Sequence, residues 1–203
     1  NLPASIVQLD QADLNDERIG CLVVGPGMGD TPQVLTLALT SRAPKVIDAD
    51  GITHLGEPER LIGQDAILTP HEGEFRRLFA EIDGSKPERA LEGARRTGAV
   101  LVYKGPDTLI AAPDGRLAFA PPAPAWLASA GTGDALSGII AAMRARGLDA
   151  FDAAYAGVWL HGRSAEQRPE DEKESVVRSP QQEGAPLWPR TSDCGLSDGC
   201  GLG

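Results

Sequence analysis

The residues best suited to chemistry are Gly131-Thr132-Gly133-Asp134, which stand just before a long helical pattern. Glycines let a ligand approach the backbone closely, and the unpaired N–H groups and positive dipole end of a helix attract phosphate. The carboxylate of Asp134 can take a proton from an attacking hydroxyl. The four residues therefore suit phosphoryl transfer to an alcohol. In isolation they fit equally well a glycine-rich turn in which Asp134 only caps the helix.

Two weaker candidates follow earlier strand patterns. The run Gly25-Pro26-Gly27-Met28-Gly29 permits close backbone approach, but it lacks the endings of the P-loop and of the dinucleotide fingerprint, so alone it reads as an ordinary strand-to-helix turn. Asp48 and Asp50 follow the next strand, where open α/β sheets place ligands, and could contact substrate or hold Mg²⁺ through water. Capping of the turn by Asp50 is an equally good interpretation.

His71 and Lys104 also stand at strand ends. His71 could donate a hydrogen bond to a polar substrate, and Lys104 could supply positive charge to a nucleotide phosphate held by the loop 104–108. A solvated histidine and a surface lysine are the ordinary alternatives. Because every candidate lies at the carboxyl end of a strand or at a helix N-terminus, the sequence predicts that they share one cleft.

The elements that position these residues alternate between short β-branched runs and helical patterns over residues 21–167. This alternation predicts the α/β class, with βαβ units around a mostly parallel sheet. Strands are expected over residues 21–24, 45–48, 66–68 and 99–103, with a hairpin of 108–111 and 117–120 across the turn 113–115. Helices are expected over 32–41, 85–97, 135–146 and 152–167.

Two capping boxes fix helix starts. Thr69 with Glu72 predicts a helix start after the strand 66–68, and Ser85 with Glu88 predicts another. After residue 167 the composition changes to a charge run and then to Pro, Gly and Ser with little periodicity. We expect one domain over residues 1–167 and a disordered or unrelated tail over 168–203.

Composition narrows the function classes. The formal net charge of −10 disfavours nucleic acid and anionic membrane surfaces as partners, and no apolar run approaches the ~20 residues of a membrane-spanning helix. Three cysteines without zinc or disulfide spacing, and no secretory signal at the N-terminus, favour a reducing compartment, the cytoplasm.

The order and wording of these motifs resemble the ADP- or ATP-dependent NAD(P)H-hydrate dehydratases of the ribokinase-like superfamily. The resemblance rests on residues 23–29, 46–51, 68–75, 102–105, 128–140 and 160–162. The stretch Thr69-Pro70-His71-Glu72-Gly73-Glu74, together with Asp48-Ala49-Asp50, is its most specific part. It implies a three-layer α/β/α fold and repair of the S epimer of hydrated NADH or NADPH: a nucleotide phosphorylates the ring hydroxyl, and phosphate then departs.

The resemblance also implies roles for individual residues. Asp134 would be the base at the reacting hydroxyl. The other implied roles are phosphate stabilisation by Gly131, Thr132 and Gly133, hydrate binding by Gly27, His71 and Asp134, and nucleotide binding by Lys104, Gly105, Pro106, Asp107, Thr108 and Gly133. ADP or ATP would be the co-substrate and Mg²⁺ would accompany it, with no residue assigned to the metal.

Family members carry a segment before the equivalent of Asn1, so we expect an incomplete sheet and a pocket open on one side. Two other functions stay open: a ribokinase-like kinase that stops after phosphorylating a small alcohol such as a vitamin precursor, and an inactive nucleotide-binding fragment. Homo-oligomerisation, and action with or linkage to an NAD(P)H-hydrate epimerase, are also left open.

Overall fold

The computed structural model describes residues 14–121, 124, 127, 129 and 131–166. All of them lie in the first of two units into which the chain divides, Asn1–Arg168. The second unit, Pro169–Gly203, lies outside the described residues, and so does the whole of the expected tail, 168–203.

In the part of the chain that the structure describes, six strands form one sheet in chain order. The strands are β1 (Leu22–Val24), β2 (Lys45–Ile47), β3 (Ala66–Leu68), β4 (Val100–Tyr103), β5 (Leu109–Ala111) and β6 (Leu117–Phe119). Strands β1 to β4 are parallel, whereas β5 and β6 form an antiparallel hairpin on β4. The mostly parallel sheet and its hairpin are confirmed. Among the described residues β1 is an edge strand, and its Val23 is 43% exposed.

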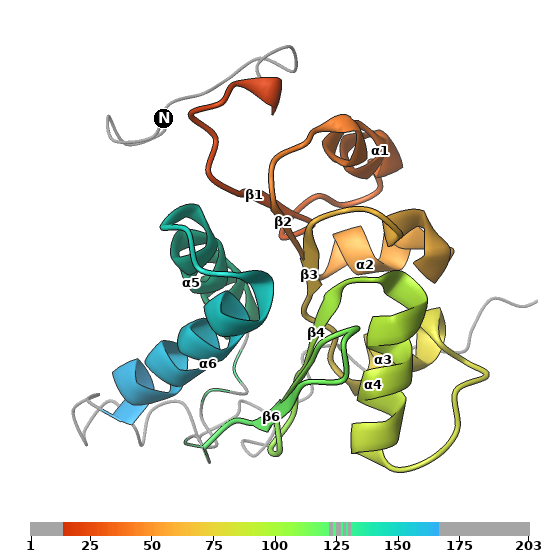
Figure 1. The fold of residues 1–203 in the computed structure, drawn as a ribbon, viewed down its shortest axis with the longest axis vertical. Coiled ribbons are helices and arrows are strands. Elements are labelled where there is room, and N and C mark those ends of the chain that lie inside the picture. Colours follow the sequence, from red (N-terminus) through yellow and green to blue (C-terminus); the bar gives the residue numbers. More distant parts are fainter. Residues whose placement is uncertain (1–13, 122–123, 125–126, 128, 130, 167–203) are drawn as a thin grey trace, which may run out of the picture. The chain divides into compact units, whose positions relative to one another are not determined.

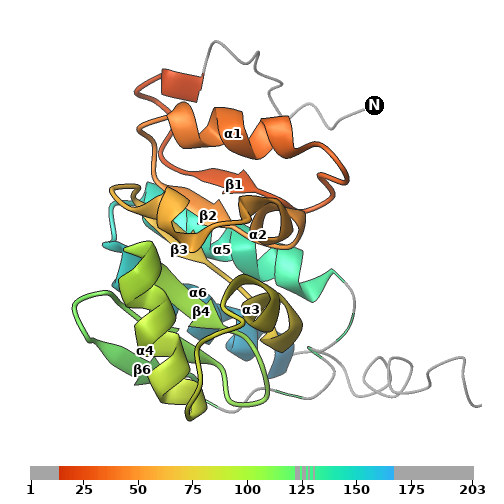
Figure 2. The same cartoon turned by 90° about the vertical axis from the view of Figure 1, so that its right-hand side faces the viewer.

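The helices cover both faces of this sheet (Figure 1). They are α1 (Pro32–Thr40), α2 (Asp50–Leu55), the 3₁₀ helix η2 (Pro58–Leu61), α3 (Glu72–Leu78), α4 (Lys86–Thr97), α5 (Thr132–Ala145) and α6 (Ala150–Glu166). Strands β1 to β4 follow one another across the sheet in chain order. Right-handed crossovers therefore place all the helices that connect them on the same face. Helices α5 and α6 follow the hairpin and cover the opposite face, which completes the expected three layers (Figure 2).

Alternation along the central strands divides the core in two. Ile47, Leu68 and Leu101 pack with the residues of α1 to α4, whereas Val46, Ile67 and Val102 pack with those of α5 and α6. Strands covered on both faces are apolar at successive positions. This explains why β2, β3 and β4 are buried throughout.

The capping boxes divide into one correct and one incorrect prediction. Ser85 and Glu88 form the box that starts α4, as expected. At α3 the box is made by His71 and Glu74, so the predicted pair Thr69 and Glu72 is wrong. Thr69 and Pro70 continue the extended chain instead: the Thr69 amide donates to the Ile47 carbonyl, and the Lys104 amide donates to the Pro70 carbonyl. Pairing with neighbouring segments therefore delays the helix by two residues.

Two further differences concern the site. Helix α5 begins at Thr132 rather than Ala135, because Gly131 adopts a left-handed conformation (φ 84°) and starts the helix at once. Helix α2 was not expected, because a segment this short is a weak helix former by itself. Its Ile52 and Leu55 are buried in the core, so packing stabilises the helix. None of the helices in the described ranges is long and apolar enough to cross a membrane.

Candidate functional site

The first turn of α5 presents the predicted phosphate-binding backbone. Gly131 is the N-cap residue, and Thr132, Gly133 and Asp134 form the first turn. The Thr132 amide donates to the Ser129 carbonyl at 3.4 Å, and the amides of Gly133 and Asp134 have no partner within the helix. The Thr132 hydroxyl donates to the carbonyls of Leu127 and Ser129, at 2.5 and 2.7 Å, so it fixes the preceding loop. Asp134 is exposed to solvent, as a base for an incoming hydroxyl must be.

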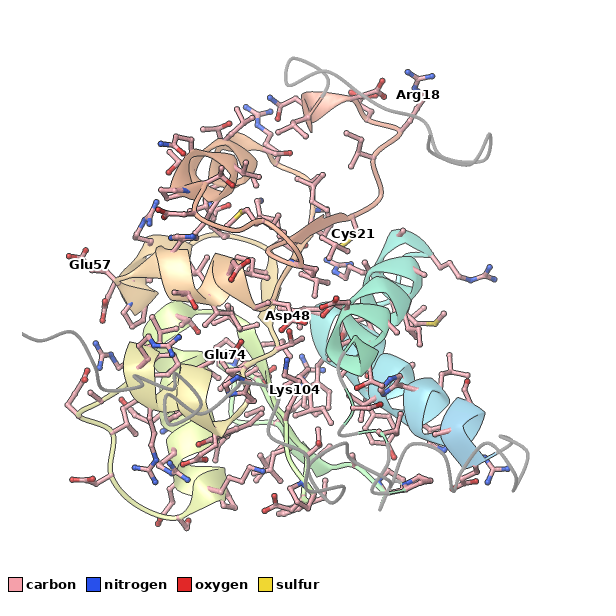
Figure 3. The ribbon with its side chains drawn as sticks, turned by 180° about the vertical axis from the view of Figure 1, so that it is seen from behind. Arg18, Cys21, Asp48, Glu57, Glu74 and Lys104 are labelled. Atoms are coloured by element: carbon pink, nitrogen blue, oxygen red, sulfur yellow. The ribbon has the colours of Figure 1, made fainter. Side chains whose placement is uncertain are left out.

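A partly buried ion pair lies directly beside this turn. Lys104, after β4, donates from Nζ to Oδ1 of Asp48, after β2, at 2.8 Å. A Cβ added at Gly133 would lie 3.5 Å from Lys104 Nζ and 3.8 Å from Asp48 Oδ2. The carboxyl ends of β2 and β4 and the start of α5 therefore meet at one point (Figure 3).

The predicted substrate residue His71 adjoins the same point through Glu74. Glu74 Oε2 lies 4.0 Å from Lys104 Nζ, and it accepts a hydrogen bond from the His71 amide at 2.8 Å. Nδ1 of His71 accepts from the amides of Gly73 and Glu74, at 2.9 and 3.1 Å. Since Nδ1 is an acceptor, a neutral ring carries its proton on Nε2. Nε2 lies 3.6 Å from Oε1 of Glu74, and the His71 side chain is 59% exposed, so a ligand can reach the ring beside Glu74.

The loop from Lys104 to Thr108 is built by its own residues and held by α4. Gly105 has a φ of 156°, and its N–H and carbonyl both bond the Thr108 hydroxyl, at 3.2 and 2.8 Å. Nζ of Lys86, on α4, donates to the carbonyl and to Oδ1 of Asp107, at 3.0 and 2.5 Å. This hydrogen bond from Lys86 lowers the pKa of Asp107. Lys86 therefore anchors the predicted nucleotide loop, and sequence reasoning missed it because only the fold brings α4 to the loop.

Behind this loop, a charged network surrounds Tyr103, the residue before Lys104. Its ring stacks on Phe75 at 4.3 Å, and its hydroxyl donates to Glu72 at 2.5 Å. Hydrogen bonds from Tyr103 and then from Arg89 lower the pKa of Glu72 to about 2, whereas burial raises the pKa of Tyr103. Glu72 therefore stabilises β4 and α4 just before the loop begins.

The glycine loop 25–29 is tied to the residues that follow Asp48. The Gly29 amide donates to Oδ2 of Asp50 at 2.8 Å, and Nε2 of His54 lies 2.8 Å from the Gly29 carbonyl. A Cβ at Gly25 would meet the Asp48 carbonyl at 1.8 Å, so this loop requires glycine there. Gly27 has a φ of 65°, and a Cβ there would meet nothing within 4 Å. Asp50 thus shapes the loop that is expected to bind the hydrate.

Another expected motif residue, His161 on α6, also reaches α5. Burial lowers the pKa of His161, and the interaction of its ring with the Thr132 backbone opposes this shift. The start of α5 is therefore held from the helix beside it as well as from the sheet.

The structure thus brings together Lys104, Gly133, Asp48 and Glu74, and links His71 to them. Asp48 is 1% exposed, and both of its oxygens already accept hydrogen bonds. Its burial therefore does not fit the prediction that it contacts substrate or holds Mg²⁺ through water. The described residues contain no group of three or more His, Cys, Asp or Glu side chains that could hold a metal ion. A pocket lined by Ile52, Thr53, Gly56, Glu74, Arg77 and Leu78 shares only Glu74 with the site.

A family model for NAD(P)H-hydrate dehydratases matches residues 3–182. The chain belongs to the NAD(P)H-hydrate dehydratase family. The matched range covers every predicted site residue from Gly27 to Asp134, and it extends beyond residue 167, so the domain boundary at that position stays a prediction.

Solved structures share the fold of this dehydratase-family chain. It is similar to the ADP/ATP-dependent NAD(P)H-hydrate dehydratase of Bacillus subtilis, co-crystallised with ATP/Mg²⁺: 29% identity, a TM-score of 0.63, and coverage of 84% of this chain and 68% of that one. A ribokinase-like superfamily protein of Enterococcus faecalis shares the fold at 23% identity and a TM-score of 0.65, over 75% of this chain and 56% of that one. The expected ribokinase-like architecture is confirmed.

Among curated relatives, the bifunctional NAD(P)H-hydrate repair enzyme Nnr of Moorella thermoacetica is 37% identical in an alignment 179 positions long that covers 81% of this chain. This dehydratase-family chain spans about a third (34%) of that relative's length.

Proposed function

We propose that the chain catalyses the dehydration of (6S)-NAD(P)H hydrate to NAD(P)H, driven by ADP or ATP. The observation that carries the proposal is the exposed Asp134 in the first turn of α5, one residue after Gly133, beside which the Lys104 ammonium lies. A base, backbone donors and a cation around one helical turn are the groups that phosphoryl transfer to a hydroxyl requires. Membership of the dehydratase family supports the substrate class.

In the proposed reaction, Asp134 accepts the proton of the hydroxyl on the saturated ring carbon while that oxygen attacks the terminal phosphorus of the nucleotide. The shortened nucleotide leaves, AMP when the donor is ADP. The ring nitrogen then pushes its electron pair toward the carbon, the C–O bond breaks, and phosphate departs. Loss of a proton from the neighbouring carbon restores the double bond. Phosphate leaves far more easily than hydroxide, which is the reason for the first step.

The remaining site residues are proposed in the roles that the family resemblance implies. Lys104, Gly105, Pro106, Asp107 and Thr108 would bind the nucleotide, with Gly133; Gly131, Thr132 and Gly133 would stabilise the transferring phosphoryl group; Gly27 and His71 would contact the hydrate. The exposed Nε2–H of His71 and the anchored loop 104–108 support these assignments. Mg²⁺ would arrive on the phosphate oxygens of the nucleotide, since it keeps most of its other ligands as water.

We place this reaction in the cytoplasm, where nicotinamide and adenine nucleotides are both found. The negative net charge of −10 supports small-molecule partners rather than nucleic acid or membrane surfaces. Action beside an NAD(P)H-hydrate epimerase, and assembly into a homo-oligomer, are further proposals that a pull-down and light scattering would test.

The deciding experiment mixes the chain with hydrated NADH, Mg²⁺ and either ADP or ATP. Return of dihydronicotinamide absorbance, with one phosphate released per NADH formed, is the expected result. Omission of the nucleotide should abolish it.

Two other outcomes would contradict the proposal. A stable phosphorylated alcohol formed from another substrate would identify a kinase. Calorimetric binding of nucleotide without any turnover would identify an inactive nucleotide-binding fragment.

A further inference from the structure

We propose that Asp48 is a positioning residue for the phosphoryl transfer: its buried carboxylate holds the Lys104 ammonium against the first turn of α5. The inference rests on the proposed function, because it assigns Lys104 a phosphate to face. Asp48 itself does not touch the reacting atoms in this scheme. It acts through Lys104.

Both oxygens of Asp48 are engaged by groups from different parts of the fold. Oδ1 accepts from Lys104 Nζ at 2.8 Å and from the Ala49 amide at 2.9 Å. Oδ2 accepts from the Ser137 hydroxyl at 2.7 Å. Asp48 is 1% exposed and Ser137 is fully buried, whereas the Lys104 side chain is 20% exposed, so the carboxylate itself is shielded from solvent. The carboxylate is therefore fixed in position before any ligand binds.

The partners of the Asp48 carboxylate belong to the elements that carry the proposed phosphate site. Ser137 belongs to α5, the helix whose first turn carries Gly133 and Asp134, and Lys104 begins the loop 104–108. Asp48 thus connects the end of β4 to the helix that is proposed to receive the phosphate (Figure 3). A flexible lysine on its own would hold its charge over no single point.

The charges around Asp48 also indicate that it acts together with Lys104 and not alone. An unpaired buried carboxylate next to a phosphate site would repel the nucleotide, whereas one paired with Lys104 adds no net charge. A second carboxylate, Glu74, waits 4.0 Å from the same ammonium. Without the charge of Asp48, we expect Lys104 to turn toward Glu74 and away from Gly133.

The test is a double-substitution cycle with Asp48→Asn and Lys104→Met, measured in the full chain. Asp48→Asn keeps the size of the side chain but no longer holds the Lys104 ammonium against the first turn of α5, so kcat should fall about tenfold or more. In the Lys104→Met background the same substitution should change kcat less than about twofold, because the group through which Asp48 acts is gone. Independent, additive losses of kcat would overturn the proposal.

A readout without turnover separates this inference from the proposed function. The protons of the Lys104 ammonium can be observed in a ¹H–¹⁵N spectrum and assigned by the loss of their signal in Lys104→Met. These protons should exchange slowly with solvent in the unsubstituted chain and rapidly in Asp48→Asn. An inactive unsubstituted chain would overturn the proposed function, and the ammonium signal would still decide whether Asp48 holds Lys104. An unchanged signal in Asp48→Asn would overturn the positioning role.

Two more variants complete the test. If Asp48→Asn does not fold, Ser137→Ala removes one bond to the carboxylate and should lower kcat several-fold, an effect that again disappears beside Lys104→Met. Asp65→Asn is the matched control: Asp65 pairs with Arg144 in the last turn of the same helix, and this substitution should leave kcat unchanged. An equal loss in Asp65→Asn would show that any perturbation of α5 has the same effect, which would overturn the proposal.

Discussion

Lys104 Nζ lies 3.5 Å from the point where a side chain at Gly133 would place its first carbon. The ammonium therefore faces the backbone of the helix across a space that stays open because residue 133 is glycine. A helix backbone left uncovered by glycine beside an ammonium is what the proposed phosphate site requires.

Gly133→Ala should separate folding from ligand binding. Contacts of 3.5 Å and 3.8 Å are ordinary, and alanine is favoured over glycine inside a helix by about 0.5–1 kcal/mol, so stability should be equal or higher. The added methyl group should weaken ADP binding about tenfold by blocking close approach to the backbone. Urea unfolding and calorimetry measure the two effects.

Gly138→Ala is the matched control for this substitution. Gly138 is exposed in the same helix, and a Cβ there meets nothing within 4 Å. It should gain the same stability with no change in ADP affinity. If the two variants bind ADP equally well, Gly133 is only a helix residue.

Asp134→Asn should lower turnover by about two orders of magnitude or more, because general-base catalysis depends on the carboxylate. ADP affinity should stay nearly unchanged, since the carboxylate serves the hydroxyl and not the nucleotide. Steady-state kinetics with hydrated NADH and calorimetry with ADP give the two values. Unchanged turnover would remove Asp134 from the mechanism.

Local sequence predicted most of the elements but not the partners of the site residues. Short-range signals were sufficient where the structure uses short-range contacts, as in the box of Ser85 and Glu88. At α3, Thr69 and Glu72 match the pattern of a capping box, but the helix begins after His71. Thr69 and Pro70 instead bond to Ile47 and Lys104, which lie far away in sequence.

The same limit applies to the candidate site. The rule that strand ends converge correctly brought Lys104 and Gly133 together. It could not show that Asp48 is buried and points at Lys104, because the direction of a side chain at a strand end depends on the turn that follows. The roles of Gly27, His71 and the loop 104–108 stay predictions.

His71→Asn should separate the two functions of that histidine. Asparagine is a good N-cap residue, so its side-chain oxygen can replace Nδ1 as acceptor and keep the start of α3, while the exposed Nε2–H is lost. Affinity for the hydrate should fall by about tenfold, the loss expected for one hydrogen bond. His71→Ala should lose the same affinity and also about 1 kcal/mol of stability. Hydrate binding equal to that of the unsubstituted chain in His71→Asn would leave the residue with a capping role alone.

The network of Glu72 and Tyr103 predicts a defined pH dependence of stability. The pKa of Glu72 is lowered from its ordinary 4.5 to about 2, so the network stabilises the fold fully above pH 4.5 and loses this contribution as pH falls toward 2. Glu72 is 48% exposed, so the contribution should be at most about 1 kcal/mol. Urea unfolding across this pH range should show the difference between the unsubstituted chain and Tyr103→Phe shrinking in acid. A difference that is constant with pH would contradict the network.

Ala49 has a φ of 46° and a ψ of −121°, an unusual conformation for a residue with a side chain. Because of this turn the side chains of its two acidic neighbours point in different directions. Asp48 accepts a hydrogen bond from Lys104, and Asp50 accepts one from the amide of Gly29. The conformation of Ala49 thus fixes the relative positions of the loop expected to bind the nucleotide, 104–108, and the loop expected to bind the hydrate, 25–29. Anyone transplanting this site into another scaffold would have to move the three residues from 48 to 50 as an indivisible piece.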